Sequence, residues 1–175
     1  RRAHVQELSA MPFEGLALGG FSVGEAPERR APVLADVAPR MPEDRPRYLM
    51  GLGTPGDLFD AVRAGIDMFD CVLPTRNARN GQAFTAAGRI SIKQSRFRED
   101  AAPLEEGCGC PACRRFSRAY LRHLYVCGEI LAARLLTAHN LSFYARWMSR
   151  LRTAILDGTL DGMAAEARRA TGAME

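Results

Sequence analysis

Short apolar runs alternate with helix-compatible stretches over the first hundred residues. Residues 16–18, 48–50 and 68–72 are each short and apolar, and each is followed by a glycine-containing or polar turn. This spacing predicts three buried strands. Residues 55–62 are predicted to form a helix, because Thr54 is a good N-cap and Pro55 suits the first helical position. Alternating strands and helices favour βα units around a parallel sheet.

Three further regions follow other patterns. Residues 26–46 contain five prolines but keep apolar positions at helical spacing, which predicts a short helix between loops. Those positions are Val33, Leu34, Val37 and Met41. Residues 82–85 and 90–92 are predicted to pair as a β-hairpin. Helical periodicity then runs from about residue 114 to the end, with a helix over 141–156 that ends near Gly158.

Composition limits the possible classes of protein. The chain has 175 residues, of which 47% are hydrophobic, enough for one domain with a sizeable core. Apolar runs stay shorter than the roughly 18 residues of a membrane span, and no secretory leader is visible, so we expect a cytoplasmic protein without a membrane partner. The chain opens on Arg1 rather than Met, which we interpret as a start inside a longer protein.

The net charge is +4, and Lys93 is the single lysine among 24 basic residues. Arginine suits phosphates and base edges, although a GC-rich genome produces the same bias. Charge therefore permits an RNA partner without requiring one.

Cysteine usage points to a metal. The five cysteines are odd in number, and Cys108, Cys110 and Cys113 lie within six residues, which fits a metal site better than disulfides. A closed tetrahedral zinc site needs a fourth ligand and is structural, because it has no open coordination position. The candidates are Cys127, His123 and His139, and spacing alone leaves the choice open.

Asp70 is a candidate catalytic residue. A carboxylate in an apolar run is costly unless it is hydrogen-bonded or functional, and the carboxyl end of a parallel strand favours function. A turn or capping aspartate would fit the same pattern. Arg76 and Arg79 follow in what we expect to be a polar loop, suited to nucleic-acid contact or to plain solvation.

Several motifs together resemble one family. The run Asp-Cys-Val-Leu-Pro-Thr-Arg-Asn-Ala-Arg-Asn-Gly at 70–81, the three clustered cysteines and His139 resemble bacterial tRNA-guanine transglycosylase, of the queuine tRNA-ribosyltransferase family. Residues 18–25 and 48–51 are also similar to segments of that family. The motifs occur in the family's order over nearly the whole chain and correspond to its C-terminal portion.

The resemblance implies a fold. The family is an α/β TIM (β/α)8 barrel with a zinc-binding subdomain inserted near its C-terminus. Residues 1–94 would then supply the last βα units, with the nucleophile strand and the hairpin. Residues 95–139 would form the zinc-binding subdomain, and residues 140–175 the C-terminal helices that pack back on the barrel.

The resemblance also implies a reaction. The family is a pentosyltransferase that exchanges guanine at wobble position 34 of tRNA with a GUN anticodon for a 7-deazaguanine, namely 7-aminomethyl-7-deazaguanine, in queuosine biosynthesis. Asp70 matches the nucleophile that forms a covalent intermediate with ribose, which divides one difficult displacement into two easier ones. Family members are homodimers, and Tyr120 and His123 match the dimer contact region.

The resemblance also implies roles for other residues, by their position in the matching motifs. Residues matching the base-binding site are Gly19, Gly20 and Met50. Residues matching RNA contacts are Gly51, Leu52, Gly53, Thr54, Pro55, Gly56, Asp57, Thr75, Arg76, Asn77, Ala78 and Arg79. Residues matching the structural zinc ligands are Cys108, Cys110, Cys113 and His139, which leaves Cys71 and Cys127 as thiols with packing roles.

Two alternatives belong beside this hypothesis. One is a non-catalytic, zinc-stabilised RNA- or protein-binding module, which gives no reason for Asp70. The other is the archaeal or eukaryotic relative, although Val23 near Gly20 and the short C-terminus favour the bacterial type.

The family's general acid and base-reading residues match nothing in this chain. About three strands cannot close a barrel, so we expect the isolated chain to be inactive and poorly folded.

Overall fold

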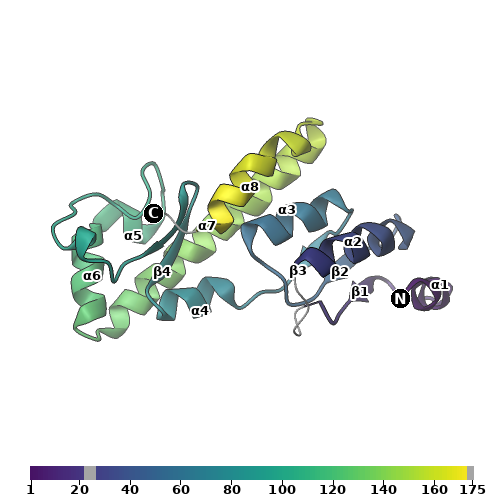
Figure 1. The fold of residues 1–175 in the computed structure, drawn as a ribbon, viewed down its shortest axis with the longest axis horizontal. Coiled ribbons are helices and arrows are strands. Elements are labelled where there is room, and N and C mark those ends of the chain that lie inside the picture. Colours follow the sequence, from purple (N-terminus) through teal and green to yellow (C-terminus); the bar gives the residue numbers. More distant parts are fainter. Residues whose placement is uncertain (22–26, 173–175) are drawn as a thin grey trace. The chain divides into compact units, whose positions relative to one another are not determined.

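The structure is a computed structural model that describes residues 1–21 and 27–172. The segment 22–26, which includes Val23, and residues 173–175 lie outside the described residues. The chain divides into two compact units, Arg1–Cys71 and Val72–Glu175, drawn in Figure 1. Within the described ranges, no helix combines the length and the apolar character that crossing a membrane requires.

The first unit is built on a parallel sheet with strand order β1-β2-β3. Its strands are β1 (Leu16–Leu18), β2 (Arg47–Leu49) and β3 (Met68–Phe69). Leu18 pairs with Leu49, and Leu49 pairs with Phe69, so the three carboxyl ends lie level. The predicted parallel βα arrangement is therefore confirmed, with the second strand beginning one residue earlier than expected.

One helix precedes the strands of this unit, and the others connect them. They are α1 (Arg2–Ser9), α2 (Pro27–Val37), the 3-10 helix η1 (Ala38–Arg40) and α3 (Pro55–Arg63). The predicted start of α3 is confirmed: the Thr54 hydroxyl accepts from Asp57 N at 3.1 Å, and Thr54 N donates to Asp57 Oδ2 at 3.2 Å. This reciprocal pair is a capping box. Helix α1 was not predicted, because Val5 is its one buried residue and leaves almost no apolar period.

Apolar side chains of α2 and the sheet form the core of the first unit. Val37 and Leu49 are almost fully buried together with Phe21, and Leu34 and Met41 join the same cluster. The helix-compatible apolar positions predicted within residues 26–46 therefore face a core. This core supports the strands whose ends carry the predicted site residues.

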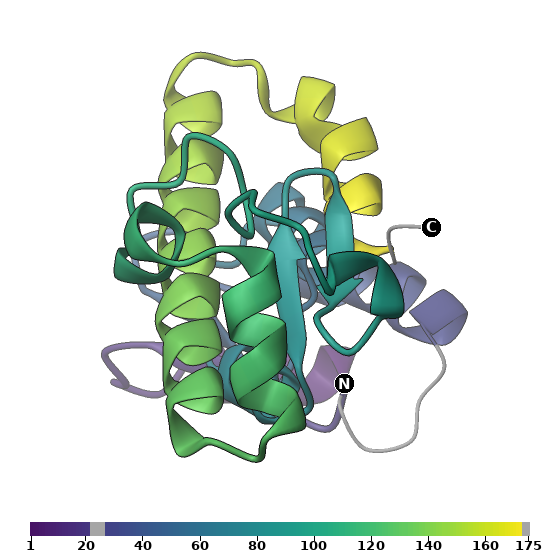
Figure 2. The same ribbon diagram turned by 90° about the vertical axis from the view of Figure 1, so that its left-hand side faces the viewer.

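The second unit combines the hairpin with helices. Its elements are α4 (Leu73–Arg79), β4 (Gln82–Thr85), β5 (Gly88–Ser91), η2 (Ser95–Phe97), α5 (Pro111–Arg115), α6 (Arg118–Val126), α7 (Ile130–Leu156), η3 (Leu160–Met163) and α8 (Ala164–Thr171). The predicted hairpin is confirmed as an antiparallel pair. Figure 2 shows α6 and α7 side by side, and α7 also contacts α4, α5 and β4.

The interpretation of residues 68–81 was wrong in two respects. The strand covers only Met68–Phe69, and residues 73–79 form helix α4 instead of a polar loop. Pro74 lies in the first turn of α4, where its missing N–H costs nothing. Pro74, Asn77 and Ala78 are buried at helical spacing. The sequence does not indicate this helix, because the three buried residues include a polar asparagine and no large apolar side chain.

The last region forms a longer helix than predicted. Helix α7 is continuous over Ile130–Leu156, so His139 lies inside a helix and not at a helix junction. This stretch contains neither glycine nor proline, so nothing in its backbone interrupts the helix. Its end was predicted correctly: Asp157 is the C-cap, and Gly158 follows with φ +68°.

Candidate active site and metal centre

The carboxyl edge of the parallel sheet gathers the predicted base-binding residues. Because the strand ends are level, Gly19, Met50 and Asp70 follow directly at one edge. Met50 N donates to Leu18 O at 3.0 Å, and a Cβ placed on Gly19 would lie 3.6 Å from Met50 Sδ. Met50 is 44% exposed, so an apolar side chain is presented beside a glycine turn. That combination is suited to a flat, mostly apolar ring.

Glycine is required at two turns of this edge. Gly20 has φ +82° and Gly51 has φ +76°, which side chains with a Cβ rarely adopt. Gly20 follows β1 and Gly51 follows β2, and the Gly51 turn brings its backbone N–H to the Asp70 carboxylate.

Two donors meet the Asp70 carboxylate. Tyr48 Oη donates to Asp70 Oδ1 at 2.7 Å, and Gly51 N donates to the same oxygen at 2.9 Å. The Tyr48 hydrogen bond, followed by that from Gly51, lowers the pKa of Asp70 below its ordinary value. The same bond raises the pKa of Tyr48, since the phenol is stabilised as a donor. An ionised, exposed carboxylate held in one orientation has the properties of a nucleophile.

Tyr48 was not singled out from the sequence. The sheet register explains its position. Tyr48 pairs with Met68, and Asp70 lies two residues after Met68, so the side chains of Tyr48 and Asp70 lie on the same face of the sheet. Recognising this required the register of two strands that are twenty residues apart.

Residues 51–57 follow β2 and enter α3. Leu52, Gly53 and Pro55 are buried, and Gly53 lies very close to Cys71. Thr54 and Asp57 use their side chains to cap α3, and Asp57 also lies 3.5 Å from Arg30. These observations give several residues of the stretch a structural role, and their contact with RNA stays a prediction.

Helix α4 carries the second predicted RNA-contact segment. Arg76 and Arg79 are exposed near its C-terminal end, whereas Asn77 and Ala78 face the interior. Thr75 Oγ1 donates to Val72 O at 3.2 Å. The two guanidinium groups are therefore displayed three positions apart on one exposed helix face.

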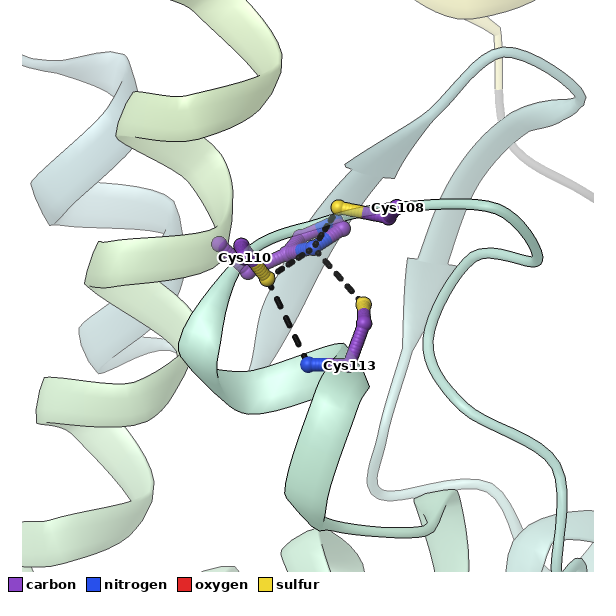
Figure 3. A group of neighbouring side chains, drawn as sticks. Cys108, Cys110 and Cys113 are labelled. Carbon is purple, nitrogen blue, oxygen red and sulfur yellow. Dashed lines mark hydrogen bonds between the residues drawn. The ribbon is translucent and has the colours of Figure 1, made fainter.

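The second unit brings together four potential metal ligands. One ligand atom from each of Cys108, Cys110, Cys113 and His139 lies within 4.8 Å of all the others. Figure 3 shows the three sulfur atoms directed toward a common centre. His123 and Cys127 lie outside this cluster, so the fourth ligand left open by spacing is His139.

The distances fit a zinc ion. His139 Nδ1 lies 3.8 Å from Cys108 Sγ, 3.5 Å from Cys110 Sγ and 3.3 Å from Cys113 Sγ. Tetrahedral coordination with Zn–S bonds of about 2.3 Å and a Zn–N bond of about 2.0 Å separates nitrogen from sulfur by about 3.5 Å. The cluster is therefore suitable for a structural zinc ion, with all four positions supplied by protein.

The surroundings orient the ligands. His139 is fully buried, and its Nε2 lies 2.8 Å from Phe84 O, which requires the proton on Nε2 and leaves Nδ1 free to bind metal. Burial raises the pKa of the Cys110 and Cys113 thiols and lowers that of His139. Buried thiolates are thus unfavourable unless a cation compensates their charge.

Arg146 contributes further compensation. Its Nη1 donates to Cys108 Sγ at 3.1 Å and to Ser142 Oγ at 2.9 Å, and Nη2 pairs with Glu105. Zinc with three thiolates and a neutral imidazole would carry one net negative charge. The guanidinium lies where it would offset that charge.

Comparisons with known proteins agree with this arrangement. A family model described as "Queuine tRNA-ribosyltransferase" matches residues 1–173. The chain is 60% identical over 159 residues to a protein of that name from Sorangium cellulosum, covering 90% of this chain and 40% of the relative. It is 53% identical over 166 residues to the one from Solidesulfovibrio magneticus, covering 95% and 44%.

The third relative gives the same result. The chain is 55% identical over 161 residues to the queuine tRNA-ribosyltransferase of Syntrophobacter fumaroxidans, covering 92% of this chain and 43% of the relative. The chain thus spans less than half the length of these relatives and corresponds to their C-terminal part. The family consists of TIM-barrel enzymes, with which the parallel βα units are consistent. The chain belongs to the queuine tRNA-ribosyltransferase family.

Proposed function

We propose that this chain is the C-terminal part of a tRNA-guanine transglycosylase. The complete enzyme, meaning this chain together with the N-terminal part that its relatives possess, exchanges guanine at wobble position 34 of tRNA for 7-aminomethyl-7-deazaguanine in queuosine biosynthesis. Its substrates are tRNAs with a GUN anticodon. The observation that carries the proposal is the Asp70 carboxylate, held ionised by Tyr48 and Gly51 at the sheet edge that also displays Met50.

The reaction has two displacements. A carboxylate oxygen of Asp70 attacks C1′ of the ribose, and the C1′–N9 bond breaks with its electron pair leaving on guanine. A proton reaches the departing guanine from a general acid in the N-terminal part. The incoming base then attacks C1′ through its ring nitrogen and gives the proton of that nitrogen to the same N-terminal group, now acting as a base. The bond between C1′ and Asp70 breaks with its electron pair returning to the carboxylate.

The residues beside Asp70 support recognition of the base. Gly19 and Gly20 allow the backbone to approach the ring, and Met50 provides an apolar surface under it. Arg76 and Arg79 would contact phosphates or bases next to the wobble position. Asn77 and Ala78, which are buried, would act by supporting the helix.

Zinc has a structural role in this proposal. Cys108, Cys110, Cys113 and His139 would hold it, and a zinc ion with four protein ligands has no position for water or substrate. When bound, it supplies folding free energy to the second unit and takes no part in the displacement.

The architecture and assembly are proposals of the same kind. Residues 1–94 would complete the barrel, residues 95–139 would form the inserted zinc subdomain, and residues 140–175 would pack back on the barrel. A homodimer is supported by exposed apolar side chains on and after α6, where Tyr120 is 40%, Val126 62% and Ile130 76% exposed. Tyr120 is stacked on Phe116, which holds its ring in place for a partner.

The decisive experiment uses the complete enzyme with Asp70→Asn. Incubation with excess tRNA and no added free base should leave part of the wild-type enzyme covalently attached to tRNA on a denaturing gel. Asp70→Asn should abolish this adduct and, in a separate exchange assay, the incorporation of labelled guanine. Asp60→Asn, an exposed carboxylate on α3, is the matched control and should behave as wild type. Equal incorporation by Asp70→Asn would reject the nucleophile and favour a binding module.

A further inference from the structure

Asn140 is a fully buried polar residue that the proposed function does not use. It lies in the middle of α7, directly after His139, and has 0% exposure. A buried amide is costly unless its hydrogen-bonding groups are satisfied, and here each is. Its Oδ1 accepts from Phe84 N at 3.0 Å, and its Nδ2 donates to Pro74 O at 2.9 Å and Gln82 O at 3.1 Å.

These three bonds connect separate elements. Pro74 is in the first turn of α4, whereas Gln82 and Phe84 belong to β4. One amide therefore joins α7 to the helix that displays Arg76 and Arg79. A leucine in its place would leave two carbonyl oxygens and one N–H without this partner.

The metal site is joined to the same strand. His139 Nε2 bonds to Phe84 O, and Asn140 Oδ1 bonds to Phe84 N, so adjacent residues of α7 hold both peptide groups of Phe84. His139, a potential metal ligand, and Asn140, which bonds to α4, are thus neighbours on α7, and both bond to Phe84 of β4. Movement of either would be transmitted to the other through direct hydrogen bonds.

We propose that Asn140 is a positioning residue for tRNA binding, which fixes α4 against the metal-bearing helix so that Arg76 and Arg79 meet the RNA. This inference rests on the proposed function. Arg79 lies five residues beyond Pro74, roughly 7.5 Å along the helix, so a tilt of about 10° at the first turn would move its backbone by about 1 Å. Displacements of that size are enough to weaken an oriented contact by about tenfold or more.

The test compares two substitutions in the complete enzyme. Asn140→Leu has a similar volume and loses all three bonds. Asn140→Asp keeps an acceptor for Phe84 N but removes the amide donors to Pro74 and Gln82. Both should raise KM for tRNA about tenfold, leave kcat within about threefold of wild type, and leave KM for the free base unchanged. Metal analysis should still find one zinc per chain.

A matched control separates positioning from loss of stability. Leu136→Ala removes a fully buried side chain from the same helix, one turn before Asn140, without touching these hydrogen bonds. It should lower Tm at least as much as Asn140→Leu while leaving KM for tRNA unchanged. If the two Asn140 variants raise KM for tRNA no more than Leu136→Ala does, the inference is wrong.

A double-mutant cycle tests the route through the arginines. In a background that carries both Arg76→Ala and Arg79→Ala, Asn140→Asp should raise KM for tRNA by less than threefold, because the contacts that it positions are already missing. A full tenfold effect in that background would contradict the inference.

Hydrogen exchange separates this inference from the proposed function. Amides of α4 should exchange at least tenfold faster in Asn140→Asp than in Leu136→Ala, whether or not tRNA is a substrate. Unchanged α4 exchange would overturn the positioning role. Failure of wild-type enzyme to form a covalent tRNA adduct would instead overturn the proposed function alone.

Discussion

The close approach of Gly53 to Cys71 makes a sharp prediction about Asp70. A Cβ built on Gly53 would lie 2.4 Å from Cys71 Cβ and 2.3 Å from Cys71 Sγ. Gly53 lies outside the positive-φ region, so its backbone conformation permits alanine and only the contact with Cys71 opposes it. Gly53→Ala therefore perturbs the residue directly after the nucleophile without introducing backbone strain.

The size of the displacement follows from these distances. Ordinary contact begins at 3.4 Å, so the two Cβ atoms are about 1 Å too close. Both residues are at least partly buried, and overpacking of this kind costs about 1–3 kcal/mol if the fold absorbs it. A shift of about 1 Å passed to Asp70 is expected to slow the displacement about 100-fold, because such misplacement of a reacting group is sufficient for a loss of that order.

The assay is the rate of covalent attachment of the complete enzyme to tRNA in single turnover. Gly53→Ala should react about 100-fold more slowly than wild type. Adding Cys71→Ala should not restore the rate, because the Cys71 Cβ at 2.4 Å remains. Adding Cys71→Gly should recover at least tenfold, because the nearest remaining atom is the Cα at 3.8 Å.

Two results would refute this reasoning. Wild-type rates for Gly53→Ala would show that the contact is relieved without moving the nucleophile. Equal rescue by Cys71→Ala and Cys71→Gly would show that the Cβ contact is not the cause.

Three further predictions test other parts of the structure. Tyr48→Phe removes the principal donor that lowers the pKa of Asp70, so the pKa should rise and the acid limb of the pH profile for attachment should move to higher pH; an unmoved limb would contradict the assigned role. Cys110→Ser should lose bound zinc on metal analysis, and retention of one full equivalent would reject the ligand set. Thr54→Ala should lower the free energy of unfolding by about 1 kcal/mol in urea titrations, because the cap of α3 is lost; Thr54→Ser keeps the hydroxyl and should remain within about 0.5 kcal/mol of wild type.

The elements that depend on short-range sequence patterns could be predicted from the sequence. The strand at 16–18, the Thr54-capped helix and the hairpin follow from apolar spacing and turn residues, and the structure confirms them. Three cysteines within six residues likewise predicted a metal cluster. The identity of the fourth ligand came from the resemblance, because His139 is 26 residues from Cys113 and only the packing of α7 brings the two together.

The features that sequence reasoning missed depend on contacts between distant segments. Asn77 and Ala78 are buried in α4, which packs against α7, and the sequence does not show that this contact exists. Tyr48 reaches Asp70 across two strands, and Asn140 reaches Pro74 over 66 positions. Each is a polar group whose partner is found only after the chain has folded.

The second unit gives a structural zinc ion a clear role in folding. Its only sheet is a two-stranded hairpin, within the part of the chain that the structure describes, and such a hairpin is marginal in water by itself. A zinc ion held by this cluster would join the segment 108–113 to α7, and from α7 hydrogen bonds lead to β4 and α4. Because a ligand set of this kind does not persist in the unfolded chain, the free energy of metal binding stabilises the folded unit. We therefore expect bound zinc to hold α4 in place, so that removing the metal raises KM for tRNA before it slows the displacement proposed at Asp70.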